Sequence, residues 1–542
     1  MNDTQFWRSQ RYGEKEYQEQ ADGRLYVWYT GILFYYDGSY LEKDVLKIAY
    51  LLISGELDFN LLHGFFRIAI YDKDTHLYYF FGDNSGTQYF YIDEDKNTFS
   101  DSLLQLAEKK EIEPNYNAIY QLLVGDYILT NDTIINGITK TCNGSYYILY
   151  EGGVKLTNND KKLKKLSELN GMQLSEYMSL LMSAMEGSTI CAVCTGGTDS
   201  RTILSHLDYL GAKPELIITG HPDNPDIPVA KEISKRLELP LEIENPPEYS
   251  NEWLYKALLF SDYSFDPVLS YRHQVKMQWT EKKQFHFEFG GVGGEFYKNK
   301  YFVLTHYFQF KSALNDVNKV SDLLFGNMKH PDKWIGSKVK SYHSAVTESI
   351  NDLIKKNLDK GLLFAYNGIG SHIMRQKQQG ITNNYTNGVT KIDPLVDRDV
   401  IALASKDSPF KHAMDFWQRN EVTKYCEKIS RIQTDQGYSL STHPAMLFKD
   451  GVKKLRFISN RKIDAFRRRL HLRVKNRKII GSHYWDSDYK MILASKEFRE
   501  AYDCCVRIGI VEESATPNEI PINKIGNILM IGTLFKDKTY EY

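Results

Sequence analysis

The stretch Cys191-Ala-Val-Cys-Thr-Gly-Gly-Thr-Asp-Ser-Arg201 joins a short apolar run to two adjacent glycines, an aspartate and three hydroxyl side chains. A glycine loop between a strand and a helix exposes several backbone N–H groups with no side chain in the way. The start of the following helix adds partial positive charge, so an anion such as phosphate is the natural ligand. The alternative is a glycine turn whose aspartate only caps the helix.

Roles within this loop follow from the chemistry of its side chains. Asp199 is the expected ligand of a magnesium ion that bridges phosphate groups. A P-loop NTPase would need the pattern G-x-x-x-x-G-K-S/T, and its lysine is absent here. The expected phosphate-binding residues are Thr195, Gly196, Gly197, Thr198, Asp199 and Ser200.

Strands and helices alternate after this loop. Residues 189–194 read as a strand, and the helix that follows carries Ile203, Leu204, Leu207 and Leu210 on one face before Gly211 ends it. "ELIITG" (215–220) reads as a second strand, "DIPVAKEISKRLEL" (226–239) as a second helix and "LEIE" (241–244) as a third strand. This order predicts a parallel, doubly wound α/β sheet, and ligands of such sheets bind at the carboxyl ends of the strands.

The rest of the chain divides by pattern. Residues 25–149 contain short runs rich in Tyr, Phe, Ile and Val, closed by Asp, Asn or Gly, which predicts a strand-rich domain with hairpin turns. The charged segment 157–170 marks a boundary. Beyond residue 445 the chain is basic, and residues 461–478 hold nine Lys or Arg and one acidic residue. A solvated helix, a peptide leader, a glycan phosphate or RNA remain possible explanations of this basic stretch.

Composition limits the class of protein. The 542 residues are too many for one compact core, and 42% hydrophobic with 25% charged residues is typical of a globular protein. The net charge of −1 excludes a protein that binds polyanions through its overall charge. Six cysteines are too few to staple a chain of this length, and no apolar run is long enough for a membrane helix. We therefore expect a cytoplasmic protein.

Several stretches together resemble a known family. "TGGTDS" resembles the S-G-G-x-D-S loop of the PP-loop ATP pyrophosphatases, and the wider chain resembles the asparagine synthetase superfamily. Residues 218–239 are similar to that family's second strand and helix, "FEFGGVGGEFY" (287–297) to its second glycine-rich loop, and "KIDPLVDRDVIALA" (391–404) to its V-P-F-L-D segment. Residues 62–92, 99–103 and 135–149 follow the order of the class II glutamine amidotransferase-like domain.

The resemblance implies an α/β protein of two domains and an extension. Residues 1–160 would form a strand-rich Ntn-type αββα domain similar to class II glutamine amidotransferases. Residues 161–445 would form a PP-loop ATP-binding domain with a doubly wound parallel sheet, and residues 446–542 a basic, mostly helical extension.

The implied activity is that of an AMP-forming amide ligase, with ATP and Mg²⁺. It would adenylate a carboxylate on a small molecule, peptide or glycan and transfer an amine donor to it. The alternatives are ammonia-dependent asparagine synthesis, a tRNA-modifying PP-loop enzyme, and a non-catalytic scaffold that keeps the fold. Neither a membrane nor a nucleic acid is an expected partner, and the sequence does not indicate an oligomeric state.

The chain departs from the family at the N-terminal nucleophile and in the second glycine-rich loop. Glutamine-hydrolysing members use a cysteine exposed at the N-terminus, whereas residue 2 is Asn and the first cysteine is Cys142. We therefore expect no glutamine hydrolysis. The second loop places Gly294 where the family has an aspartate, with Glu295 next, so Glu295 is a candidate catalytic residue and Gly291, Gly293 and Gly294 are candidate nucleotide contacts.

Other candidates come with open alternatives. The family's catalytic lysine has no clear counterpart, with Gln433 nearest and Lys428 and Arg431 as available cations. Cys191 and Cys194 have the spacing of a metal or redox pair, but they fit better as buried residues of an apolar strand. Asp226 could cap its helix or serve the nucleotide, and His221 could face the adenylate or be solvated. Candidate substrate residues are Asp262, Tyr271, Arg272 and Arg431, with Tyr263 and Asp266 nearby.

Overall fold

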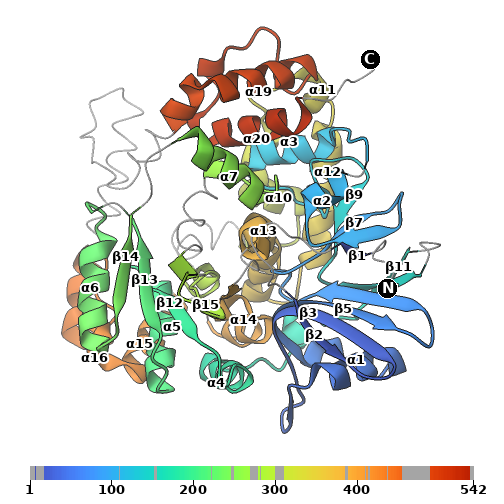
Figure 1. The fold of residues 1–542 in the computed structure, drawn as a ribbon. Helices are drawn as coiled ribbons and strands as arrows, with labels where there is room; N and C mark the ends of the chain where they lie inside the picture. The colour runs from blue at the N-terminus through green and yellow to red at the C-terminus, as the bar shows by residue number, and fades with distance from the viewer. Residues whose placement is uncertain are drawn as a thin grey trace.

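The fold is mixed α/β and contains one parallel and two antiparallel-rich sheets, which confirms the broad class expected from the sequence. The computed structural model describes residues 6–7, 17–108, 110–151, 156–220, 222–245, 250–268, 279–280, 282–298, 311–384, 389–408, 411–412, 415–435, 437–453 and 489–536. Figure 1 shows the N-terminal sheets on one side of the molecule and the parallel sheet on the other.

A large antiparallel sheet begins the N-terminal region, with the strand order β11-β10-β6-β5-β3-β2 and β4 paired to β3. One face packs on α1 (Val45–Ser54) through Phe66, Ile68 and Ile70 of β5. Because strand side chains alternate between faces, Ala69 and Tyr71 point to the opposite side. The strands are β2 (Gln18–Ala21), β3 (Leu25–Tyr36), β4 (Leu41–Glu42), β5 (Leu62–Asp72), β6 (Leu77–Gly82), β10 (Ser145–Tyr150) and β11 (Leu156–Asp160).

A second sheet, in the order β1-β8-β7-β9, covers that opposite face. Phe80 of β6 stacks on Phe99 of β8 with ring centroids 3.8 Å apart. Tyr91 of β7 points away from this interface into a cluster with α2 and α3, so the layers run helix, sheet, sheet, helix. The elements are β1 (Phe6–Trp7), β7 (Tyr91–Asp93), β8 (Thr98–Ser100), α2 (Leu103–Ala107), α3 (Tyr116–Gly125) and β9 (Ile138–Lys140).

The third sheet is parallel throughout, with the order β14-β13-β12-β15-β16. The chain runs outward from β12 to β14 and then returns to the other side of β12 with β15, so the strand order reverses between β12 and β15. Open α/β sheets bind ligands at such a reversal. The elements are β12 (Ile190–Val193), α5 (Thr198–Tyr209), β13 (Glu215–Thr219), α6 (Asp226–Leu237), β14 (Leu241–Glu244), β15 (Phe287–Phe289) and β16 (Thr390–Ile392).

The predicted elements 189–244 are confirmed almost residue for residue. Ile203, Leu204 and Leu207 of α5 are buried against the sheet, and Gly211 ends the turn after the helix with a φ of +74°. The helix starts at Thr198, two residues before the first residue assigned to it from the sequence. The aspartate of the glycine loop therefore lies in the first helical turn.

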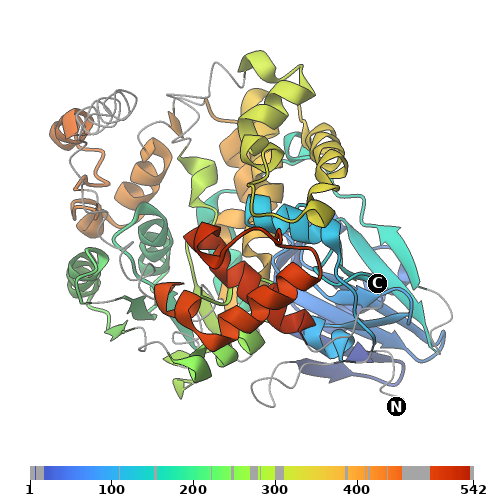
Figure 2. The ribbon, with the colours of Figure 1, turned by 90° about the horizontal axis from the view of Figure 1, so that it is seen from above.

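Helices cover the remaining surfaces, and several of them share one apolar core. Figure 2 shows α19 and α20 beside the N-terminal α3 and beside α7, and one apolar cluster includes Leu122, Leu258 and Leu529. This cluster crosses all the boundaries expected from the sequence. The helices are α4 (Leu174–Ala184), α7 (Asn251–Ser261), α10 (Val317–Phe325), α11 (Ser337–Lys340), α12 (His343–Asn357), α13 (Leu362–Asn384), α14 (Arg398–Ser405), α15 (Phe416–Tyr425), α16 (Glu427–Ser430), α19 (Lys496–Arg507) and α20 (Ile525–Phe535).

In the part of the chain that the structure describes, no helix is both long enough and apolar enough to cross a membrane. The basic stretch 461–478 lies outside the described residues.

Candidate functional site

The first glycine loop connects β12 to α5 and is held from several sides. The N–H of Gly196 donates to Oδ1 of Asp226 at 3.1 Å, and the hydroxyls of Thr195 and Ser200 lie 2.9 Å apart. A Cβ on Gly196 would stand 2.5 Å from that same Oδ1, so a larger residue would displace the Asp226 carboxylate. Gly197 is the N-cap of α5, and no side chain caps this helix start. The positive end of α5 is therefore available to an anion.

Hydrogen bonds from Arg201 connect this loop to a segment that is distant in the sequence. Its buried guanidinium donates to the carbonyls of Gly196 at 3.0 Å, Gln433 at 2.9 Å and Ile432 at 2.6 Å. Burial lowers the pKa of Arg201 to about 10, which still leaves the group charged at neutral pH. The loop conformation thus depends on residues more than 200 positions further along the chain.

The second glycine loop follows β15 and touches the first. A Cβ on Gly291 would lie 2.8 Å from the backbone C of Asp199 and from the N of Ser200, and one on Gly294 would lie 2.0 Å from Oδ1 of Asp199. Gly293 has a φ of +95°, which side-chain-bearing residues rarely adopt. On the other side of the loop, the N–H of Val292 donates to Asp393 at 3.0 Å. These glycines allow the two loops to meet at Asp199.

Asp199 lies at the meeting point of both loops. Its Oδ2 accepts from Nζ of Lys298 at 2.7 Å, and its Oδ1 accepts from Nε2 of Gln418 at 2.5 Å and from the hydroxyl of Thr198 at 3.2 Å. Glu295 is more exposed and its carboxylate is 4.0 Å from the same lysine nitrogen. Burial lowers the pKa of Lys298, but the charge of Asp199 outweighs it and raises the pKa above its usual value. The site therefore holds a charged lysine between two carboxylates.

Lys298 and Gln418 were not predicted from the sequence. Lys298 follows Glu295 by three residues, and the helical turn Gly294–Tyr297 brings the two together, so the local spacing held a usable signal. Gln418 comes from α15, 219 residues after Asp199, and no local pattern marks it.

Three proposed substitutes for the family's lysine have partners elsewhere. Nζ of Lys428 pairs with Asp208 at 3.0 Å, and the exposed Arg431 pairs with Glu427 at 2.6 Å. Gln433 meets the first loop only through its carbonyl oxygen, which Arg201 binds. Among their contacts in the described residues, none involves Asp199.

Of the predicted substrate residues, the structure describes Asp262 and Arg431 but not Tyr271 and Arg272. The buried carboxylate of Asp262 accepts from the N–H groups of Leu103 and Leu104 at 2.6 and 2.9 Å, so it caps α2. These contacts give Asp262 a structural role at the junction with the N-terminal region. Tyr271, Arg272 and His221 lie outside the described residues.

The cysteine pair of β12 packs in the interior, as preferred from the sequence. Cys191 and Cys194 are both fully buried, and burial raises the pKa of Cys194 to about 12. Such a thiol stays protonated and is a poor metal ligand. Asp226 holds Gly196 rather than capping its own helix, and its burial, followed by the charge of Asp435, raises its pKa.

The donor set around Asp199 fits magnesium. Mg²⁺ usually takes one or two carboxylates from the protein and completes its shell with phosphate oxygens and water. Asp199 and Glu295 supply two carboxylates, but Lys298 and the N–H of Gln418 occupy the oxygens of Asp199, so a magnesium ion binds there only when Lys298 moves away. The Oε1 of Gln418 is buried with no hydrogen-bond partner among the described residues, so this pocket is not saturated by the protein alone.

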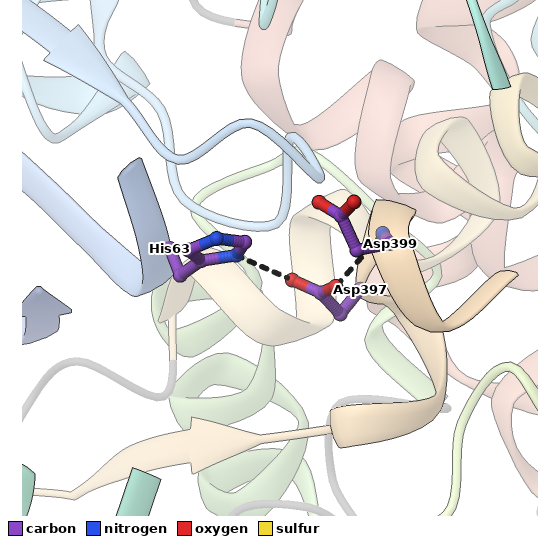
Figure 3. Close-up of side chains that lie close together, drawn as sticks. All are labelled: His63, Asp397 and Asp399. Atoms are coloured by element: carbon purple, nitrogen blue, oxygen red, sulfur yellow. Dashed lines mark hydrogen bonds and ion pairs between the residues drawn. The ribbon is translucent and has the colours of Figure 1, made fainter. Parts of the chain in front are cut away.

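A second cluster joins the two domains expected from the sequence (Figure 3). His63 of β5 faces Asp397, with Nδ1 3.5 Å from Oδ2, and Asp399 lies beside them. Oδ1 of Asp397 accepts from the N–H of Asp399 at 2.9 Å and caps α14. Asp397 both faces His63 of β5 and caps α14. We therefore interpret the cluster as a structural contact that holds β5 against α14, and we call it the latch.

This latch predicts a pH-dependent stability. Burial lowers the pKa of His63, but Asp397 outweighs it and raises the pKa above 6.5; this stabilising charge is lost as the pH rises through the raised value. Burial and the charge of Asp397 raise the pKa of Asp399 from 3.8 to about 6, so the stability tied to its protonated form is lost as the pH rises from 3.8 to about 6. The cluster should therefore lower the wild-type Tm as the pH rises, through Asp399 between pH 3.8 and about 6 and through His63 above pH 6.5.

Asp399→Asn tests the latch, because the amide cannot ionise. Its Tm at pH 8 should exceed that of the wild type by about 2 °C, with the gain vanishing at low pH. Asp407→Asn, which removes a more exposed carboxylate just beyond α14, is the control. Equal loss of Tm with pH in wild type and Asp399→Asn would contradict the assignment.

No protein-family model and no curated protein match the chain. The functional conclusion consequently rests on the geometry of the two glycine loops and of Asp199.

Proposed function

We propose that the chain is an ATP-dependent, AMP-forming amide ligase. The observation that carries the proposal is the meeting of two glycine loops, at the carboxyl ends of the adjacent parallel strands β12 and β15, around Asp199 and Lys298. A pyrophosphate group needs backbone donors without side-chain obstruction, a metal carboxylate and a nearby cation. All three are features of this one location.

Adenylation answers a chemical problem of carboxylates. Their charge is delocalised and oxide is a poor leaving group, so an amine does not attack them directly. Attack of the carboxylate on the α-phosphate of ATP forms an acyl-adenylate and releases pyrophosphate; attack of the amine then forms the amide and releases AMP. The enzyme must chiefly hold the reactants in line and stabilise the charge of departing pyrophosphate.

Each residue has a role in this scheme. The start of α5 and the glycine N–H groups would bind the β- and γ-phosphates, while Asp199 orients a magnesium ion. Magnesium, when bound, supplies positive charge between the phosphates. Lys298 would move from Asp199 toward the leaving pyrophosphate, a shift of one ion pair that its flexible side chain permits.

The amine donor in this proposal is ammonia or an amine of the substrate. The first cysteine of the sequence, Cys142, precedes β10 and lines a cavity between the N-terminal region and α13. It has no contact with Asp199 among those the structure describes. Glutamine is therefore not expected to support the reaction.

Pyrophosphate release provides the test. The full chain with Mg·ATP should release pyrophosphate when supplied with a suitable member of a panel of amino-acid, peptide and glycan carboxylates, and an amine should be needed for amide product. Ammonium should substitute for glutamine in all positive reactions. If no carboxylate elicits pyrophosphate and ATP binds without turnover, the scaffold alternative is favoured instead.

A further inference from the structure

A cavity of about 640 Å³ lies between the N-terminal region and α13, on the far side of the second glycine loop from Asp199. Its wall includes Asn84 and Asn143 from the N-terminal sheets, Arg375 from α13 and Val292 from the loop. This volume lies within the range of small-molecule sites. It is separate from the proposed pyrophosphate site, because neither Asp199, Lys298 nor any residue of the first glycine loop lines it.

Arg375 brings a positive charge into this cavity. Its guanidinium donates to Oδ1 of Asn143 and, at 2.8 Å, to Nδ1 of His372. Burial, followed by the charge of Arg375, lowers the pKa of His372 to about 3, so this histidine is neutral; its Nε2–H donates to the carbonyl of Leu129 at 2.7 Å. Both partners of the arginine are therefore uncharged.

No carboxylate among the described residues forms an ion pair with Arg375, and its Nε is buried without a hydrogen-bond partner. The side chain as a whole is half-buried, and burial lowers its pKa. A buried cation without a counter-ion is costly, and an anionic ligand removes that cost.

A second buried cation adds to the excess. Nζ of Lys161 donates to the carbonyl of Gly82 at 2.7 Å and approaches Oδ1 of Asn84 at 3.4 Å, and Asn84 in turn accepts from Asn143 at 3.1 Å. This hydrogen-bond chain links Lys161 to Arg375. Burial lowers the pKa of Lys161 to about 7, so it carries part of a charge at neutral pH.

The carboxylate of Asp83 already has hydrogen-bond donors within its own turn. The buried Asp83 raises the pKa of both cations, but its carboxylate accepts from the hydroxyl and N–H of Thr87 at 2.7 and 3.2 Å and from the N–H of Gln88 at 2.8 Å. It stabilises its own turn instead of pairing with Arg375. The lining itself keeps a net positive charge, because it holds five Lys or Arg residues and three carboxylates: Lys164, Lys165, Lys356, Arg375, Arg398, Asp352, Asp359 and Asp393.

The backbone is shaped to admit the arginine. Gly86 has a φ of +71°, and a Cβ there would stand 2.2 Å from Cδ of Arg375. Apolar side chains also line the cavity: Leu129, Leu163, Leu166, Phe296, Leu353 and Ile401. A ligand that fits both parts has an anionic head and an apolar body.

We propose that this cavity binds a small organic carboxylate, whose carboxylate pairs with the guanidinium of Arg375 while its hydrocarbon part packs on the apolar wall. Arg binds carboxylates through two parallel N–H donors, which favours this head group over a point-like anion. The site needs neither ATP nor magnesium, so it stands whether or not the ligase activity is found.

Cys142 reports on occupancy of the cavity. It lines the cavity and is half-buried, whereas the other five cysteines are buried, so iodoacetamide should alkylate it selectively in the folded chain. Hexanoate at ten times its Kd should slow alkylation of Cys142 by about tenfold, as measured by peptide mass spectrometry. Hexanamide and hexylammonium, matched in length but not anionic, should leave the rate unchanged.

Two variants refine this test. Arg375→Met should abolish protection by hexanoate, and Lys377→Met, which removes an exposed cation from the same helix, should retain it. The proposal is overturned if the three probes protect equally, if none protects, or if folded Arg375→Met is still protected. Should Arg375→Met not fold, the comparison of the three probes on the wild type decides the question alone.

Discussion

Replacing Asp199 with asparagine is expected to reduce carboxylate-dependent pyrophosphate release by about 10²–10³-fold. The amide keeps the size of the side chain and can still bond with Gln418, but it has no charge with which to hold a magnesium ion or Lys298. Because Asp199 lies on the first turn of α5 and is partly exposed, the fold should survive. Steady-state rates with saturating Mg·ATP measure the effect.

Asp208→Asn is the matched control for this variant. Asp208 lies on the same helix and also pairs with a lysine, Lys428, but at the end remote from the glycine loops. Its replacement should change the rate by less than about twofold, as is usual away from a reacting centre. If Asp199→Asn kept the wild-type rate, the metal role of this carboxylate would be wrong.

Replacing Lys298 with methionine should lower the rate by about 100-fold, with most of the effect in kcat. Methionine fills a similar volume but removes the only lysine that contacts Asp199 among the described residues. A lysine that stabilises pyrophosphate as it leaves acts more strongly in the transition state than on bound ATP, so KM should change little.

The control for this second variant is Lys428→Met. It removes one of the cations considered as a counterpart of the family's catalytic lysine. It should retain nearly full activity. The opposite pattern, with an active Lys298→Met and an inactive Lys428→Met, would contradict this role of Lys298. It would assign the catalytic cation to Lys428, which follows α15.

Local pattern predicted the parallel sheet well. The residues of β12, α5, β13, α6 and β14 follow one another in the chain, and the burial period of each element can be read within a dozen residues. The position of the first glycine loop was predicted for the same reason, since it directly follows a strand, whereas the second loop was placed through the resemblance of residues 287–297 to the family's second loop.

Contacts between distant segments could not be predicted in this way. Gln418 reaches Asp199 from 219 residues away, and Asp262 caps a helix 159 residues earlier in the chain. The uncompensated charge of Arg375 appears only when α13 is folded against the N-terminal sheets. Local sequence patterns identify the residue types of these sites. They do not show which residues from distant segments lie close together in the fold.

The products formed from ATP test the central claim most directly. With a carboxylate substrate and magnesium, the account predicts AMP and pyrophosphate in equal amounts, lost together in Asp199→Asn. Release of ADP and phosphate, or AMP formation that is unchanged in Asp199→Asn, would contradict a pyrophosphate site at the meeting point of the two glycine loops.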